Sequence, residues 1–89
     1  MNQSLTPTQF DRGAPTETLA GTIERVTFHN AETGFCMFNA QAWRKRDLVP
    51  VIGHAPAIAA GEWITAIGIW FTDRQHELQF KADALQAPL

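Results

Sequence analysis

The chain has 89 residues, of which 45% are hydrophobic and 18% are charged, and its formal net charge is −2. This length fits one small domain, and the hydrophobic fraction excludes a chain that is disordered throughout. The slightly acidic balance argues against a protein that holds nucleic acid mainly through bulk positive charge. The only cysteine, Cys36, excludes a disulfide framework within the chain.

Residues 1–17 combine scattered Ser, Thr and Gln with Pro7 and Pro15 and contain few apolar side chains. This composition predicts a flexible N-terminal tail, followed by one domain over residues 18–89. No segment has the apolar run of a signal peptide or the ~18 apolar residues of a membrane span. We therefore expect a cytoplasmic protein that has no membrane partner.

The first strand is predicted over residues 19–30. Val26 and Phe28 share one face with each other but are out of phase with Ile23. One extra residue next to Glu24 would restore the phase, so the pattern predicts a β-bulge there. A long bulged strand is what a chain needs in order to curl around a small barrel.

Four further segments have the composition and alternation of strands, separated by turn residues. They cover residues 35–43, 48–54, 63–71 and 76–85. Gly34 is expected to supply the positive φ angle of the first hairpin loop. Residues 55–62 are expected to form a short connection with at most one helical turn.

A long first strand and a wider gap between the third and fourth strands are typical of an OB-fold. We therefore predict an all-β protein, a five-stranded Greek-key barrel of the OB-fold type. The helix that this fold often inserts between strands three and four should be very short or absent. An SH3-like barrel of similar length is the structural alternative.

Alternation along each strand divides the side chains into an interior set and an exterior set. The expected interior set is Leu19, Ile23, Val26, Phe28, Cys36, Phe38, Ala40, Val49, Val51, Ile64, Ala66, Trp70, Leu78, Phe80 and Ala82. Phe35 and Met37 then face outward on the second strand. Two exposed apolar side chains on one strand face indicate either a ligand or a protein partner.

Catalytic motifs are missing from the sequence. It contains no phosphate-binding loop, no dinucleotide fingerprint and no nucleophile beside a base, so we predict no catalytic residue and no cofactor. Cys36 lies in an apolar strand, where a buried thiol is inert. The three histidines lie in different predicted strands, without the spacing of metal ligands, so no metal site is expected.

A binding function fits the pattern better. Barrels of this class hold single strands with aromatic side chains that stack on bases and with cations that follow the phosphates. The candidate nucleic-acid-binding residues are Phe35, Met37, Arg44, Lys45, Arg46, Arg74, His76 and Lys81. The alternative for residues 44–46 is a solvated loop, and the alternative for Phe35 and Met37 is a protein interface.

The sequence resembles the N-terminal OB-type module of RecD-like ATP-dependent DNA helicases, which are similar to the exodeoxyribonuclease V alpha chain. The resemblance rests on "GTIERVTFHN", "ETGFC", "VIGH", "AGEW" and "HELQFKA" and covers about residues 19–85. In some relatives we expect cations near Asn39 and Gln41, and both residues are neutral here.

The resemblance implies an accessory module without catalytic activity that works beside ATP-dependent motor domains. Its expected partners are single-stranded DNA and the motor domains of the parent helicase. The alternative is a protein-interaction module whose apolar strand face docks on other helicase domains or on a second copy of itself.

Overall fold

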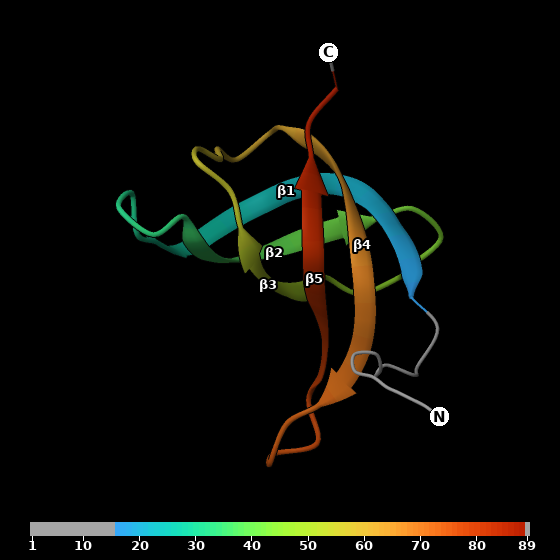
Figure 1. The fold of residues 1–89 in the computed structure, drawn as a ribbon. Coiled ribbons are helices and arrows are strands. Elements are labelled where there is room, and N and C mark those ends of the chain that lie inside the picture. Colours follow the sequence, from blue (N-terminus) through green and yellow to red (C-terminus); the bar gives the residue numbers. More distant parts are fainter. Residues whose placement is uncertain (1–15, 89) are drawn as a thin grey trace, which may run out of the picture.

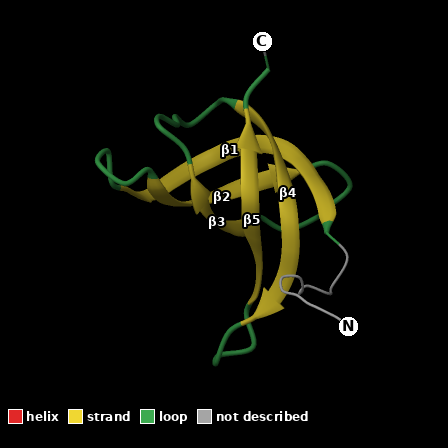
Figure 2. Ribbon diagram, in the orientation of Figure 1, coloured by secondary structure: helices red, strands yellow, loops and turns green. Residues whose placement is uncertain are grey.

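The computed structural model describes residues 16–88, which form five strands and no helix (Figure 2). The strands are β1 (Glu17–His29), β2 (Phe35–Ala42), β3 (Val49–His54), β4 (Trp63–Thr72) and β5 (Leu78–Gln86). The predicted tail lies almost entirely outside the described residues. Within those residues, no helix is long and apolar enough to cross a membrane.

The strands form a closed barrel in the order β1-β2-β3-β5-β4, and β4 pairs with β1 to complete it. All neighbouring strands are antiparallel except β3 and β5, which run parallel. In Figure 1, β4 and β5 cross the directions of β1 and β2 steeply, as expected for a small, strongly twisted barrel. The prediction of an all-β, five-stranded barrel of the OB-fold type is confirmed, and residues 55–62 contain no helix.

β1 pairs with its two neighbouring strands along different halves of its length. Its first half, Glu17–Thr22, pairs with β4, whereas its second half pairs with β2 from Gly21 onward. Two register shifts interrupt the β1–β2 ladder, one between Ile23 and Arg25 and one between Val26 and Phe28. The first shift is the predicted bulge. The second was not predicted, because apolar residues stand on both sides of it.

The second bulge corrects the expected interior set. It returns Phe28 to the outer wall, opposite Met37 of β2, where 48% of its surface is exposed. Leu78 is also wrongly placed, because it is the first residue of β5 and is 53% exposed. Val26 and Trp70 are only partly buried and pack against the core from its edge. Ala42, which was not expected inside, is buried.

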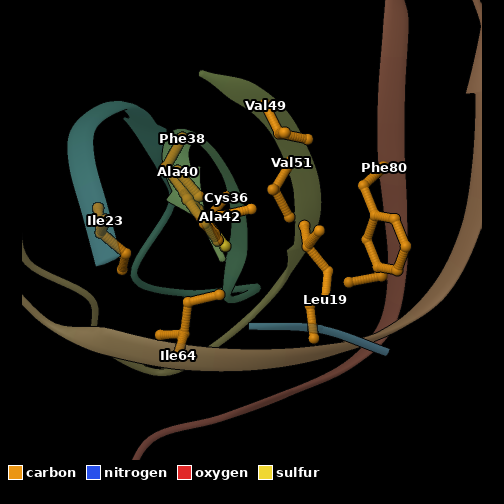
Figure 3. Close-up of a cluster of buried hydrophobic side chains, with 12 residues drawn as sticks. Leu19, Ile23, Cys36, Phe38, Ala40, Ala42, Val49, Val51, Ile64 and Phe80 are labelled. Carbon is orange, nitrogen blue, oxygen red and sulfur yellow. The ribbon is translucent and has the colours of Figure 1, made fainter. Parts of the chain in front are cut away.

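The core lies along the inside of the barrel (Figure 3). It consists of Leu19, Ile23, Cys36, Phe38, Ala40, Ala42, Val49, Val51, Ile64, Ala66, Phe80 and Ala82. The largest of these side chains, Phe38 and Phe80, come from strands on different sides of the barrel, and small residues leave room for them. A Cβ at Gly68 would lie 2.0 Å from the carbonyl oxygen of Lys81, so only glycine permits this approach of β4 to β5.

Cys36 is fully buried and faces the core from β2. Burial raises the pKa of its thiol, and hydrogen bonding with the backbone of Gly53 and Ala55 opposes this shift only in part. A thiol that stays protonated is a poor nucleophile. The geometry therefore gives Cys36 a packing role.

We expect Cys36→Ser to lower the free energy of unfolding by about 1–3 kcal/mol, because it places a hydroxyl in an apolar interior. Urea denaturation measures this loss. The native protein should also react slowly with thiol reagents at neutral pH. Rapid labelling of the folded protein would contradict the burial of Cys36 and the register of β2.

The raised pKa also has a consequence for pH dependence. The folded state keeps the thiol protonated at pH values where the unfolded chain, with an ordinary value near 9.0, already ionises. The contribution of Cys36 to stability is therefore complete below about pH 9 and is lost as the pH rises further. Cys36→Ala should remove this alkaline component, which denaturation curves at several pH values would resolve.

Candidate nucleic-acid interface

An aromatic patch covers the outer wall of β1, β2 and β3 near the β1–β2 hairpin. The aromatic patch consists of Phe28, Phe35, Met37, Ile52 and His54. The ring centroids of Phe28 and Phe35 are 5.9 Å apart, and those of Phe35 and His54 are 5.6 Å apart. Both distances are in the range of favourable aromatic pairs, so the rings support one another while Phe28 and His54 remain exposed.

Strand register places a lysine in the same row as this patch. Phe28 pairs with Met37, Met37 pairs with Ile52, and Ile52 pairs across the parallel ladder with Lys81 of β5. The row continues to Ile69 of β4. Since directly paired residues share one face of a sheet, the ammonium group of Lys81 lies on the same outer wall as Met37, two strands away. A cation two strands from exposed aromatic rings is an arrangement that can meet a phosphate and a base of one strand.

The basic loop, residues 43–48, connects β2 to β3. Backbone hydrogen bonds fix its start: the N–H of Trp43 donates to the carbonyl of Ala20 at 2.7 Å, and the N–H of Lys45 donates to that of Ala42 at 3.1 Å. The side-chain amide of Gln41 donates to the carbonyl of Lys45 at 3.0 Å. The first turn of the loop is therefore held against both β1 and β2.

Two cation–π contacts organise the side chains of the basic loop. The Arg44 guanidinium lies 4.5 Å from the centre of the Trp43 ring, and the Lys45 ammonium lies 4.9 Å from the centre of the Trp70 ring. Both distances are within the ~6 Å reach of this attraction. Trp43 is nevertheless 67% exposed, the highest value among the large hydrophobic side chains described.

Grooves lie on both sides of the contact between Lys45 and Trp70. One is lined by Trp43 and by the first residues of β1, from Glu17 to Ala20. The other is lined by the rest of the basic loop together with Glu77 and Leu78 from the start of β5. The basic loop therefore meets the β4–β5 hairpin in space as well as the beginning of β1.

The β4–β5 loop is built around Asp73. Its carboxylate accepts hydrogen bonds from the backbone N–H groups of Gln75 and Glu77, both at 2.9 Å, and from the side chain of Gln79. These bonds hold the exposed residues Arg74 and His76 in a fixed turn. His76 has a φ angle of 65°, and Arg44 has a φ angle of 69°. A positive φ angle is uncommon for arginine and less so for histidine, and such angles are frequent at functional sites.

The structure places the eight candidate residues on three separate parts of the barrel surface. Phe35 and Met37 lie in the aromatic patch, with Lys81 in the same row. Residues 44–46 lie at the opposite end of β2. Arg74 and His76 lie in the β4–β5 loop, whose last residue, Glu77, lines one groove beside the basic loop. Figure 1 shows the β1–β2 hairpin and the β2–β3 loop on opposite sides of the molecule. The candidate residues therefore form no single cluster: Phe35, Met37 and Lys81 share the wall of the aromatic patch, residues 44–46 form the basic loop, and Arg74 and His76 lie on the β4–β5 loop.

Sequence reasoning missed several residues of these groups. Phe28 was assigned to the core, and Trp70 was expected inside, although it borders both grooves. Trp43 was treated only as the last residue of a strand. Its position directly before three cations was a usable signal, because aromatic and cationic side chains together are the usual equipment for binding single strands.

Metal ligands are not grouped in the described part of the chain: no three His, Cys, Asp or Glu side chains come together there. His29 has a structural contact instead, since its Nε2 lies 2.9 Å from the carbonyl oxygen of Ala55. This contact ties the end of β1 to the β3–β4 connection. The chemistry that the surface offers is therefore stacking, hydrogen bonding and charge attraction.

The closed order of the five strands, with an exposed face on β2 and β3, defines this protein as an OB-fold domain. Comparison with protein families gives a match over residues 16–89 to the OB-fold domain of the ATP-dependent DNA helicase YrrC. The chain belongs to this family of helicase OB-fold domains. A search of curated proteins finds no significant match.

The exposure of Phe28 can be tested against that of a buried phenylalanine. We expect Phe28→Ala to lower the free energy of unfolding by about 1 kcal/mol, because mainly the ring pair with Phe35 is lost. Phe38→Ala should cost about 3–5 kcal/mol, since Phe38 is 1% exposed and its removal leaves a cavity. Urea denaturation compares the two variants. Equal losses would place Phe28 in the core and contradict the second bulge.

Proposed function

We propose that this OB-fold domain is a non-catalytic accessory module that contacts single-stranded DNA beside the motor of a RecD-like helicase. The observation that carries the proposal is the aromatic patch on the outer wall of β1, β2 and β3. Exposed rings on this wall are suited to stacking on bases, and stacking tolerates any sequence because every base has a π face. Membership of a helicase OB-fold family supports DNA as the ligand.

The charge of the chain favours DNA as the ligand only at the basic loop. Three of the seven Lys and Arg residues of the chain are consecutive, at positions 44–46, whereas the whole chain carries a net charge of −2. A few phosphate contacts then provide the electrostatic part of binding. Such binding is weak at physiological salt, and each phosphate contact contributes up to ~0.7 to its salt slope.

A protein partner is the second candidate, and the outer wall of β4 favours it. Ile67, Ile69 and Phe71 alternate with interior positions there and remain partly exposed. They extend the apolar row that begins with Phe28 and Met37. Under this alternative the wall docks on the motor domains or on a second copy of the chain.

Titration of the protein into a labelled thymidine oligonucleotide of about ten nucleotides tests the first proposal. We expect saturable binding at low salt. Replacing Arg44, Lys45 and Arg46 by alanine should weaken binding and reduce the salt slope by up to ~0.7 for each lost contact. Phe35→Ala should cost roughly 1–3 kcal/mol with little change of slope, because stacking releases no counterions.

Phe71→Ala is the matched control, since it removes a phenylalanine from the outer wall of β4, away from the aromatic patch. We expect it to leave oligonucleotide affinity unchanged. Absence of saturable binding by the wild type at ~20 mM salt would contradict the DNA-binding role.

The docking alternative makes a different prediction. Ile69→Glu should abolish self-association, or binding to separately added motor domains, because a carboxylate on the apolar wall would have to be desolvated. Sedimentation velocity measures the self-association. Self-association that Ile69→Glu removes, together with no oligonucleotide binding, would favour docking over the DNA-binding role.

A further inference from the structure

Trp43, directly after β2, and Trp70 of β4 lie outside the aromatic patch and have surroundings that the patch does not explain. Trp43 is the most exposed large hydrophobic residue described, and Trp70 borders both grooves of the basic loop. Each indole is in contact with a cation, Arg44 in one case and Lys45 in the other. An exposed indole beside two cations offers a flat stacking surface and positive charge within one small area.

The backbone holds this arrangement before any ligand arrives. Trp43 is fixed to Ala20 of β1, and Lys45 is fixed to Ala42 and Gln41 of β2. Arg44 lies between them at a φ angle of 69°, a conformation that glycine adopts without strain and that arginine adopts at a cost. Strained backbone of this kind is frequent at binding sites, which makes the guanidinium over the exposed Trp43 ring a candidate for contact with a ligand.

The charges around Trp43 are separated: the negative charge lies in the groove and the positive charges lie on the basic loop. Glu17 lines the groove between Trp43 and Trp70, and its Oε1 accepts a hydrogen bond from Trp70 Nε1 at 3.2 Å. A carboxylate there repels phosphate, whereas the guanidinium and ammonium groups on the loop attract it. A nucleotide would therefore place its base towards the groove and its phosphate towards the loop.

Building on the DNA-binding role proposed above, we propose that Trp43 and Trp70 form a second base-stacking subsite for single-stranded nucleic acid. Arg44 and Lys45 bind the flanking phosphates. In the unbound protein Lys45 covers the Trp70 ring. A base that stacks on Trp70 takes this place and releases the ammonium group to a phosphate.

This subsite defines the path of the bound strand. Phe35 and Trp43 are eight residues apart along β2, which corresponds to roughly 25 Å of extended chain. A single strand that uses both places must follow β2 from the aromatic patch to the basic loop. The outward residues in between, Asn39 and Gln41, are neutral and polar, so they can donate hydrogen bonds to such a strand but cannot attract it over a distance.

The test compares Trp43→Ala with Trp63→Ala in titrations with the same oligonucleotide of about ten nucleotides. Trp63 is a second exposed tryptophan that lines neither groove. We expect Trp43→Ala to weaken binding about 5- to 150-fold with an unchanged salt slope, which is the effect of losing one stacked base. Trp63→Ala should bind like the wild type.

Arg44→Gly tests the phosphate contact without damage to the fold. Glycine suits the positive φ angle, so thermal unfolding should show a stability equal to or above that of the wild type. We expect weaker binding and a salt slope lower by up to ~0.7. A wild-type salt slope in Arg44→Gly would overturn the assigned phosphate contact.

Oligonucleotide length separates this inference from the proposed function. An oligonucleotide of about three nucleotides is too short to reach both places, so the effects of Phe35→Ala and Trp43→Ala should become smaller with it than with the longer one. If the wild type binds and Phe35→Ala weakens binding while Trp43→Ala does not, the second subsite is wrong and the proposed function stands. If Trp63→Ala weakens binding as much as Trp43→Ala, the subsite is also wrong. If the wild type does not bind at all, both proposals fail.

Discussion

Every strand of a closed barrel pairs along both of its edges, and β1 does so with different halves of its 13 residues while it bends. Its first half pairs with β4 and its second half with β2, and the two ladders overlap only at Gly21 and Thr22. Two bulges supply the bend, because each adds one residue without a partner and increases the local twist. The positions of the core, the aromatic patch and the basic loop all depend on this division of β1.

The bulges also explain which parts of the fold could be predicted from sequence. The first bulge was visible because it puts Val26 out of phase with Ile23, and a change of phase between apolar residues is detectable. The second was invisible because Phe28 is apolar on either face, so alternation reads it as core. A hydrophobic residue that serves the surface cannot be distinguished by pattern from one that serves the interior. Phe28 was therefore assigned to the wrong face, because the register of the β1–β2 ladder, and not hydrophobicity, determines whether its side chain faces the interior or the outer wall.

The candidate site, too, could be predicted from sequence only in part. Phe35 and Met37 could be placed outside, because they lie next to Cys36 and Phe38 on one regular strand. The neighbours of the basic loop could not be foreseen, since Trp70 and Glu17 reach it only after β1, β4 and β5 have closed the barrel. Lys81 joins the row of Met37 through the β3–β5 ladder, a pairing between strands that are not consecutive in sequence. The alternation of apolar residues along the chain therefore predicts the strands. The groups of residues that lie together on the surface depend on how the barrel closes, which alternation does not reveal.

The balance of charges on this surface bears on how such a module can work. Glu17 and Glu77 line the same grooves as the cations of the basic loop, so the positive potential is confined to a few side chains. Attraction of phosphate over long distances is then small, and under the proposed DNA-binding role most of the binding free energy would come from stacking at short range. A weak contact of this kind is sufficient when a motor holds the same DNA strand, because tethering raises the effective concentration to about the millimolar range for a short linker. Under the same proposal, weak binding would allow the strand to leave quickly, as a surface beside a moving DNA strand requires. An acidic balance is therefore compatible with a DNA-binding role beside a helicase motor, although it would be a disadvantage for a protein that has to find DNA alone.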